Sequence, residues 1–341
     1  MLQVRLGKAG YVVNKNGFGA LPIQRITESD ATRLLRRAFD NGIDYYDTAR
    51  FYTDSESKLG AAFQQVRDKI VISTKTAALK AADFWKDLET SLRNLRTDHV
   101  EIYQFHNPPF VPKPGDGSGV YEAALEAMRQ GKILHVGITN HRIALAREAI
   151  ASGLYETLQF PLSYLSTDQE LELVELCRQA DMGVIAMKAL SGGLISDART
   201  AYAWMAQQPL IEPIWGIQRE NELDEFLECQ RETPELTPER QARIEHDRQE
   251  LAGEFCRGCG YCLPCPAGIE INNLARMTLM LSRAPHSVYL TKEFYDKEQK
   301  VLDCLHCNRC KSKCPYGLDT PALLKRNYDD FMRVWKEAGG L

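Results

Sequence analysis

Eight of the ten cysteines in this 341-residue chain fall into two short groups. The first group is CRGCGYCLPCP, residues 256–266, and the second is CLHCNRCKSKCP, residues 304–315. Disulfide frameworks spread their cysteines through loops, whereas clusters at two- and three-residue spacing in a reducing compartment are typical of metal ligands. We therefore expect this part of the chain to fold around metal. The two remaining cysteines, Cys177 and Cys229, lie in helical patterns and are expected to be ordinary packed residues.

The spacing of the second group indicates the kind of centre. It is C-x2-C-x2-C-x3-C-P, the run that holds [4Fe–4S] clusters in bacterial ferredoxins, where the fourth cysteine binds the other cluster. The same arrangement predicts two [4Fe–4S] clusters here. The expected ligands are Cys256, Cys259, Cys262 and Cys314 for one cluster, and Cys304, Cys307, Cys310 and Cys265 for the other. Structural zinc, usually held by two separated CxxC pairs, is the alternative that fits less well.

Residues 1 to about 230 alternate short apolar strands with amphipathic helices, after a hairpin over residues 2–13. Eight such alternations, buried on both faces, imply parallel strands, and eight units that close on themselves make a (β/α)8 TIM barrel. An open doubly wound sheet is the rival, but no strand is followed by GxGxxG. The strands are expected at residues 17–21, 43–48, 69–74, 100–105, 133–139, 157–160, 183–188 and 212–217.

Two helices of the barrel, over residues 33–42 and 171–183, are expected to end on a glycine cap. The polar segment 231–250 then marks a boundary, which gives a barrel domain over 1–235 and an iron–sulfur domain over 236–341. The second domain is expected to be small and mainly helical, like two-cluster ferredoxins. Its helical patterns lie at residues 271–281, 287–303 and 321–341, and the last is expected to pack on the domain, with partner docking as the alternative.

Composition excludes several classes of function. The chain is 44% hydrophobic and 26% charged, with a formal net charge of -4 and no long basic block. This balance gives no support for nucleic-acid or membrane partners. The first ten residues lack the layout of a signal peptide, and no run of about 18 apolar residues exists. We expect a cytoplasmic protein, and the sequence leaves its oligomeric state open.

Four polar residues fall at or just after the carboxyl ends of three expected strands, where a barrel builds its shared site. They are Asp47, Tyr52, Lys75 and His106. A phenol has an unperturbed pKa near 10, so it acts as a general acid near neutral pH only if its phenolate is stabilised. A lysine held by a carboxylate supplies that stabilisation, and a histidine can orient and polarise a carbonyl oxygen.

Four segments resemble the motifs of the aldo-keto reductase superfamily. They are GIDYYDTARFY…LG (42–60), VISTK (71–75), YQFHNP (103–108) and GKILHVGITN (131–140). The resemblance covers roughly residues 10–230, and with the cysteine groups the whole chain is similar to a subgroup that carries a two-cluster domain. It implies a barrel that moves a hydride between a nicotinamide cofactor and a small-molecule carbonyl or alcohol. Tyr52 would be the acid/base, Lys75 would stabilise its phenolate, Asp47 would pair with Lys75, and His106 would orient the substrate.

The same resemblance assigns contacts to the cofactor. Met187 stands where the family commonly has an aromatic residue, and Phe226 and Glu222 replace the usual asparagine and arginine, with Arg219 as the local cation. The expected cofactor is therefore either NAD or NADP. The residues assigned to the cofactor are Thr139, Asn140, Gln159, Met187, Lys188, Gly216, Arg219 and Glu225.

The loop over residues 107–120 follows the histidine and is expected to flank the pocket, with Phe110 or Trp215 in its lining. The alternative is a surface loop with no role in substrate binding. Three other tyrosines, Tyr45, Tyr46 and Tyr103, are expected to pack in the core.

Two functions remain in competition. The first is an NAD(P)-dependent oxidoreductase, and the second is an iron–sulfur electron-transfer or interaction protein that uses the barrel as a scaffold. A hydride carries two electrons together, whereas each cluster passes one, and no flavin signature is present. We therefore expect the clusters to be structural, to sense redox state, or to serve an outside redox partner protein.

Overall fold

Eight parallel strands close into a barrel in the order β10-β3-β4-β5-β6-β7-β8-β9. This structure is a computed structural model, and it describes residues 1–251, 255–283 and 288–339. The closed parallel sheet confirms the barrel and excludes the open doubly wound sheet. The strands are β3 (Gly17–Gly19), β4 (Tyr45–Asp47), β5 (Val71–Thr76), β6 (Val100–His106), β7 (Ile133–Thr139), β8 (Thr157–Pro161), β9 (Gly183–Met187) and β10 (Ile211–Gly216).

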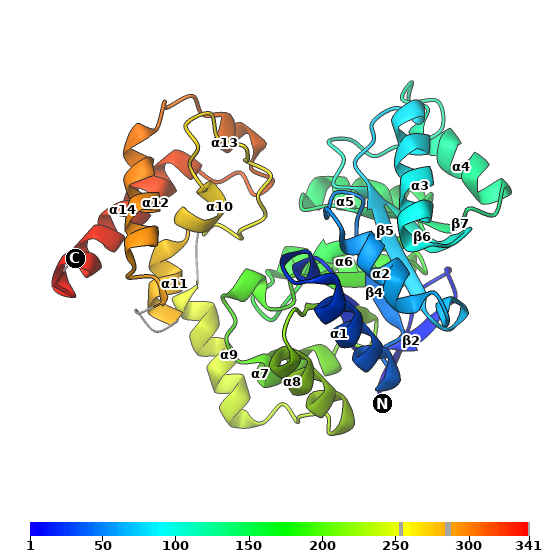
Figure 1. Cartoon of the computed structure of the whole chain (residues 1–341), viewed down its shortest axis with the longest axis horizontal. Coiled ribbons are helices and arrows are strands. Elements are labelled where there is room, and N and C mark those ends of the chain that lie inside the picture. Colours follow the sequence, from blue (N-terminus) through cyan, green and yellow to red (C-terminus); the bar gives the residue numbers. More distant parts are fainter. Residues whose placement is uncertain (252–254, 284–287, 340–341) are drawn as a thin grey trace. The chain divides into compact units, whose positions relative to one another are not determined.

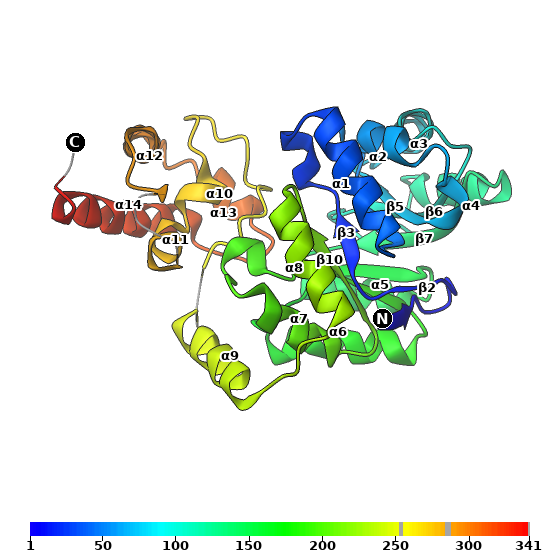
Figure 2. The ribbon, with the colours of Figure 1, turned by 60° about the horizontal axis from the view of Figure 1, so that its bottom comes forward.

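A helix follows each barrel strand. Two short 3-10 turns lie in the connections: η1 (Pro22–Arg25) precedes α1, and η2 (Arg67–Lys69) follows α2. Figures 1 and 2 show α1 to α4 on the outer side of the strands. The helices are α1 (Glu28–Asp40), α2 (Ser55–Phe63), α3 (Ala81–Leu95), α4 (Val120–Arg129), α5 (Ile143–Ser152), α6 (Asp168–Gln179), α7 (Ala198–Ala206) and α8 (Glu220–Arg231).

The predicted hairpin is present as the antiparallel pair β1 (Gln3–Arg5) and β2 (Val12–Asn14). Its buried residues Val4 and Val13 belong to one apolar cluster with Ile102, Ile185 and Ile214 of the barrel strands. The hairpin thus covers apolar side chains of the barrel strands, away from the polar residues at their carboxyl ends.

The two expected glycine caps have different outcomes. Helix α1 begins at an N-cap, Thr27, whose hydroxyl accepts the Asp30 N–H, and it is followed by Gly42 with φ +91°. After α6 the left-handed residue is Asp181, with φ +48°, and Gly183 is the first residue of β9. The cap predicted at Gly183 was therefore wrong, because aspartate also tolerates the left-handed region.

The chain divides into two compact units, Met1–Ala189 with Asp197–Ile244, and Leu190–Ser196 with Glu245–Leu341. The domain boundary expected at 235 stays a prediction. The short segment Leu190–Ser196, which contains η3 (Ser191–Gly193), groups with the second unit although it follows barrel strand β9.

The second unit is mainly helical, as expected (Figure 1, yellow to red). Its last helix buries Leu323, Leu324 and Phe331 in a core shared with Leu274, which confirms that this helix packs on the unit. Ser287 and residues 340–341, at the ends of two expected helical patterns, lie outside the described residues. The helices are α9 (Pro238–Glu250), which crosses the division, then α10 (Ile271–Leu274), α11 (Met277–Arg283), α12 (Lys292–Gln299), η5 (Lys300–Asp303), α13 (Arg309–Lys313) and α14 (Thr320–Glu337).

Candidate active site and iron–sulfur centres

The four predicted catalytic side chains lie together at the carboxyl ends of neighbouring strands. Asp47 is the last residue of β4, Lys75 is near the end of β5, and His106 is the last residue of β6. Tyr52 follows β4 in the loop that leads to α2. Parallel strands present these ends at one face of a barrel, which explains why residues far apart in sequence meet here.

Lys75 and Asp47 form a buried ion pair. The Lys75 Nζ donates to Asp47 Oδ1 at 2.6 Å and to the Thr48 carbonyl at 2.5 Å. Only 1% of Lys75 and 2% of Asp47 is exposed. Burial lowers the pKa of Lys75, and the Asp47 carboxylate opposes that shift by favouring the ammonium form. The pair therefore places the Lys75 ammonium, stabilised by the Asp47 carboxylate, at this position away from bulk water.

Tyr52 lies near both Lys75 and His106. The Lys75 Nζ is 5.4 Å from the centroid of the Tyr52 ring, and the rings of Tyr52 and His106 meet edge to face with centroids 5.9 Å apart. Burial, and after it the Lys75 ammonium, lowers the pKa of His106 to about 3. The imidazole is therefore neutral near pH 7, so it can donate one hydrogen bond without adding a second positive charge.

A layer of polar residues beneath the pair was missed by the sequence analysis. Ser73 donates to Asp47 Oδ2 at 3.2 Å, and Gln104 Nε2 donates to Ser73 Oγ at 2.5 Å and to Gln159 Oε1 at 2.8 Å. Strand periodicity could have found these residues, because Ser73 and Gln104 stand two positions before Lys75 and His106 and so share their face. This layer holds Asp47 in place.

Three residues assigned to the nicotinamide carboxamide lie at the ends of β7 and β8. Thr139 Oγ1 accepts the Asn107 N–H at 3.0 Å, and Asn140 Oδ1 accepts the N–H groups of His141 and Arg142 at 2.9 Å. Gln159 Nε2 donates to Asp47 Oδ1 at 3.3 Å. These hydroxyl and amide groups match a carboxamide chemically, and each amide NH2 keeps a second N–H for a ligand.

The other assigned residues are more dispersed. Met187 ends β9 and is half-buried, Lys188 follows it with φ +56°, and the exposed Gly216 ends β10 beside Gly19. Arg219 is exposed and pairs with Glu222 at 3.5 Å, so part of its charge is already compensated.

Glu225 lies on the exposed side of α8, and burial together with Asp197 raises its pKa. Its role as a cofactor contact stays a prediction, like the roles of the other assigned residues.

Trp215 does not line the pocket. Only 1% of its surface is exposed, and its ring stacks between Tyr202 of α7 and Phe226 of α8, with centroids 5.9 and 4.5 Å away. The prediction was wrong because Trp215 points outward from the barrel to the helices. Phe110 is half-buried in the loop after β6. Tyr45, Tyr46 and Tyr103 are buried as expected.

The eight clustered cysteines surround two cavities in the second unit. Thiols of both groups contribute to each cavity, and Cys262 borders both. Cys314 lies close enough to Cys256 to affect its thiol electrostatically, and Cys265 does the same for Cys310. The first cavity has Cys256, Cys259, Cys262 and Cys314 in its lining, and the second has Cys262, Cys265, Cys304, Cys307 and Cys310. Thiolates are the ligands of iron–sulfur clusters, so this donor set fits two of them.

A half-buried arginine, Arg276, lies beside the first cavity. Arg276 donates from Nη1 to the Gly192 carbonyl at 2.7 Å, and a Cβ on Gly258 would be 2.9 Å from its guanidinium carbon. The Cys256 thiol favours the charged form of Arg276 electrostatically, against the burial that lowers the pKa of this guanidinium. Arg276 therefore brings a positive charge to the ligand loop and holds the segment Leu190–Ser196.

Cys177 and Cys229 are fully buried, and burial raises the pKa of their thiols to about 12 and about 11. Both thiols therefore stay neutral, as expected for packed residues.

Comparison with known proteins identifies both parts of the chain. The profile of the aldo/keto reductase family matches residues 15–201. The chain belongs to the aldo/keto reductase family. It is therefore an oxidoreductase of the aldo/keto reductase type, as the resemblance predicted. A 4Fe-4S dicluster domain profile matches residues 255–319, which confirms the expected second domain of this reductase.

This aldo/keto reductase is similar in sequence to several named proteins. An uncharacterised oxidoreductase, YrpG of Bacillus subtilis, is 30% identical over 56% of this chain and 67% of its own length. The 6-dehydroglucose reductase of Novosphingobium aromaticivorans is 27% identical over 66% of this chain and 89% of its own. L-galactose dehydrogenase of Arabidopsis thaliana is 29% identical over 56% of this chain and 66% of its own length.

Among solved structures, an aldo-keto reductase from Klebsiella pneumoniae in complex with NADPH shares the fold, with a TM-score of 0.63 and 21% identity. The match covers 72% of this chain and 94% of that one. Within the described residues, no helix combines the length and the apolar character needed to cross a membrane.

Proposed function

We propose that this reductase interconverts a carbonyl and an alcohol with a nicotinamide cofactor, and that Tyr52 is its general acid/base. The observation that carries this proposal is the buried Lys75–Asp47 pair, with Lys75 Nζ 5.4 Å from the Tyr52 ring centroid. A structural tyrosine has no need of a desolvated cation beside its ring. The cation favours the phenolate, so proton transfer from Tyr52 becomes possible near neutral pH.

Each residue then has one task in carbonyl reduction. When bound, the nicotinamide supplies the hydride that reaches the carbonyl carbon. Tyr52 gives its hydroxyl proton to the carbonyl oxygen, and Lys75 stabilises the phenolate that remains. The neutral His106 donates a hydrogen bond to the same oxygen and fixes its position. Alcohol oxidation uses the same residues in reverse, with Tyr52 as the base.

Residues at the ends of β7 to β9 would hold the nicotinamide. Thr139, Asn140 and Gln159 provide the hydroxyl and amide groups for its carboxamide, and Met187 can pack against the ring. Both NAD and NADP remain within this proposal. The partial compensation of Arg219 by Glu222 argues against strong selection of a 2′-phosphate by that arginine.

We further propose that the second unit holds two [4Fe–4S] clusters on the ligand sets predicted from the cysteine spacing. The two cavities, each lined by cysteines of both groups, support that assignment. A scaffold function without catalysis is disfavoured, because the buried Lys75–Asp47 pair and its supporting layer serve no purpose in a passive barrel.

The test is a turnover screen on anaerobically purified protein, with aromatic aldehydes, ketones and sugars, and with NADH and NADPH. Tyr52→Phe should remove most turnover and leave the iron content unchanged. Tyr46→Phe is the matched control, because the Tyr46 hydroxyl donates to the Ile43 carbonyl in the core. Equal turnover by wild type and Tyr52→Phe would exclude Tyr52 as the acid, and the absence of nicotinamide binding would favour the scaffold function.

A further inference from the structure

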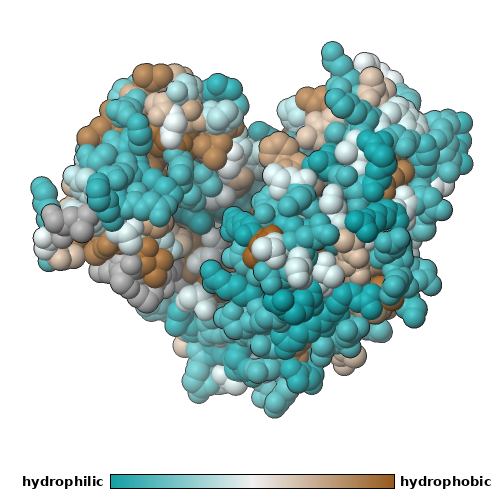
Figure 3. Space-filling model, viewed as in Figure 1, coloured by the Kyte–Doolittle hydropathy of each residue, from teal (hydrophilic) through white to brown (hydrophobic). Residues whose placement is uncertain are grey.

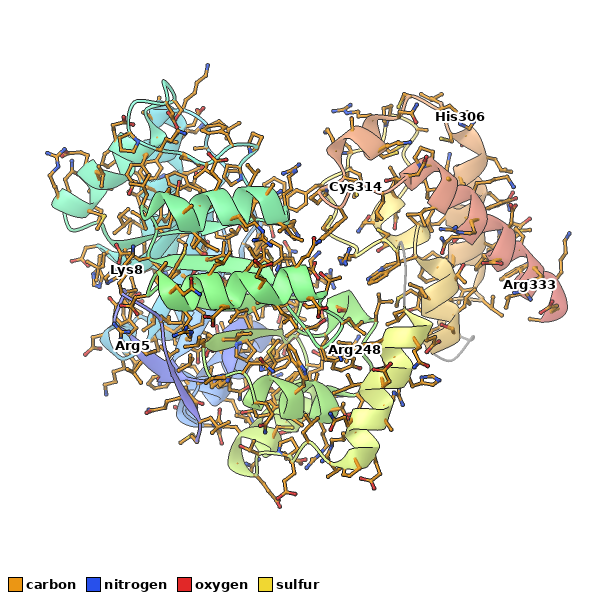
Figure 4. All side chains as sticks on the ribbon, turned by 180° about the vertical axis from the view of Figure 1, so that it is seen from behind. Arg5, Lys8, Arg248, His306, Cys314 and Arg333 are labelled. Atoms are coloured by element: carbon orange, nitrogen blue, oxygen red, sulfur yellow. The ribbon has the colours of Figure 1, made fainter. Side chains whose placement is uncertain are left out.

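The two cysteine sites differ in their exposure. Cys256 and Cys262 of the first site are 8% and 9% exposed. In the second site Cys307 is exposed, together with the neighbouring residues His306, Asn308 and Arg309. His306, labelled in Figure 4, lies at the surface of the unit. Cys310 of the second site is also only 8% exposed, and Cys259 and Cys314 of the first site are half-buried, so Cys307 is the one exposed thiol among these eight. An outside molecule can therefore approach the second site most closely at Cys307.

Two large apolar side chains are exposed next to this site. Leu302 is 60% exposed and Leu305 is 66% exposed, on either side of the ligand Cys304. Figure 3 shows apolar residues at the surface of this unit. Large exposed apolar side chains beside a functional site are typical of a surface that contacts another protein.

The same surface is positively charged. Residues 302–318 contain Arg309, Lys311 and Lys313 and one carboxylate, Asp303, which pairs with Lys300 at 3.5 Å. Lys311 pairs with Asp319 at 2.7 Å, whereas Arg309 and Lys313 have no ion pair within the described part of the chain. Several other cations of the unit are compensated, such as Lys325 by Asp329 and Arg333 by Glu337. Arg309, which lines the same cavity as Cys307, thus brings an uncompensated cation to it, and Lys313 lies one helical turn further along α13.

We propose that the surface formed by Leu302, Leu305, Cys307, Arg309 and Lys313 is the docking site of a small acidic protein that carries one electron. Cys265, Cys304, Cys307 and Cys310 would hold the cluster that accepts one electron from the reduced carrier, and the carrier would be oxidised by that one electron. No proton or covalent bond changes. Opposite charges steer the encounter, and the exposed leucines give a small contact of the kind found in transient electron-transfer complexes. The inference rests on the proposed cluster assignment.

The experiment uses the full chain with its clusters assembled, and a reduced plant-type [2Fe–2S] ferredoxin as the acidic probe. Stopped-flow absorbance gives the second-order rate of cluster reduction, and a binding assay with oxidised ferredoxin gives affinity without electron transfer. We expect both to fall as salt rises, because ions screen the attraction between exposed charges. The double variant Arg309→Glu, Lys313→Glu should lower the rate at low salt by at least about tenfold.

Lys336→Glu is the matched control, since Lys336 is an exposed lysine of α14 with no ion pair within the described residues. A rate that the double variant leaves unchanged, or no reduction by ferredoxin at all, would overturn the proposal. Tighter binding of a basic cytochrome c would do the same, as would self-association of the chain that Leu305→Asp abolishes. Iron content and the paramagnetic resonance spectrum of each variant show separately whether the clusters are present, which tests the assignment itself.

Discussion

Replacing Lys75 by methionine removes the positive charge beside Tyr52 and keeps most of the side-chain volume. The charge lies 5.4 Å from the Tyr52 ring centroid. At an effective dielectric constant of about 20, a unit charge at that distance contributes about 3 kcal/mol to the phenolate. That free energy corresponds to a loss of on the order of 100- to 200-fold in the rate of reduction.

The assay is the pH dependence of kcat for carbonyl reduction by Lys75→Met and wild type. The alkaline limb of the variant should move to higher pH, because the phenolate is no longer stabilised and the acid form persists. Lys58→Met is the control, since Lys58 is only 4% exposed, donates to the carbonyls of Ile23 and Ile26, and like Lys75 pairs with a carboxylate, here Asp54 at 2.8 Å. It should lower Tm without moving the limb. A Lys75→Met rate within threefold of wild type would refute the reasoning.

Three further predictions follow from the described contacts. Because the pKa of His106 is lowered to about 3, the rate profile should show no histidine limb between pH 5 and 7, and a limb near pH 6.5 that His106→Gln abolishes would contradict this. Cys265→Ser should damage the cluster held mainly by Cys304, Cys307 and Cys310, whereas Cys177→Ser should keep all iron, as measured by iron per chain. Arg276→Gln removes a positive charge and should lower the reduction potential of the cluster near Cys256 by about 59 mV, which is a tenfold change in the equilibrium constant for one electron. A potentiometric titration followed by paramagnetic resonance measures this potential.

Part of the site could be predicted from local sequence patterns. Asp47, Lys75 and His106 each follow a short apolar strand, and parallel strands necessarily bring such ends to one face. The same periodicity also contained the information that Trp215 and Gly216 face opposite sides of β10, so Trp215 could have been excluded from the pocket. The cap predicted at Gly183 failed because a strand could begin at that glycine while Asp181 took the left-handed conformation.

Other features depend on contacts between distant residues and leave no local signal. The segment Leu190–Ser196 joins the second unit, where Arg276, some 84 positions later, donates to the Gly192 carbonyl. Leu305 and Cys307 are exposed in the segment that precedes α13. Cysteine spacing predicts which thiols share a cluster, but it does not predict which cluster reaches the surface.

The most direct measurement of the central proposal follows the hydride itself. Anaerobic enzyme would be incubated with 4-nitrobenzaldehyde and with NADH or NADPH deuterated at the transferring C4 position, and the alcohol product analysed by mass spectrometry. We predict one deuterium on the carbinol carbon with wild type, and almost no labelled alcohol with Tyr52→Phe that retains its iron. Alcohol that forms without deuterium, or labelled alcohol formed equally by Tyr52→Phe, would contradict hydride transfer assisted by Tyr52.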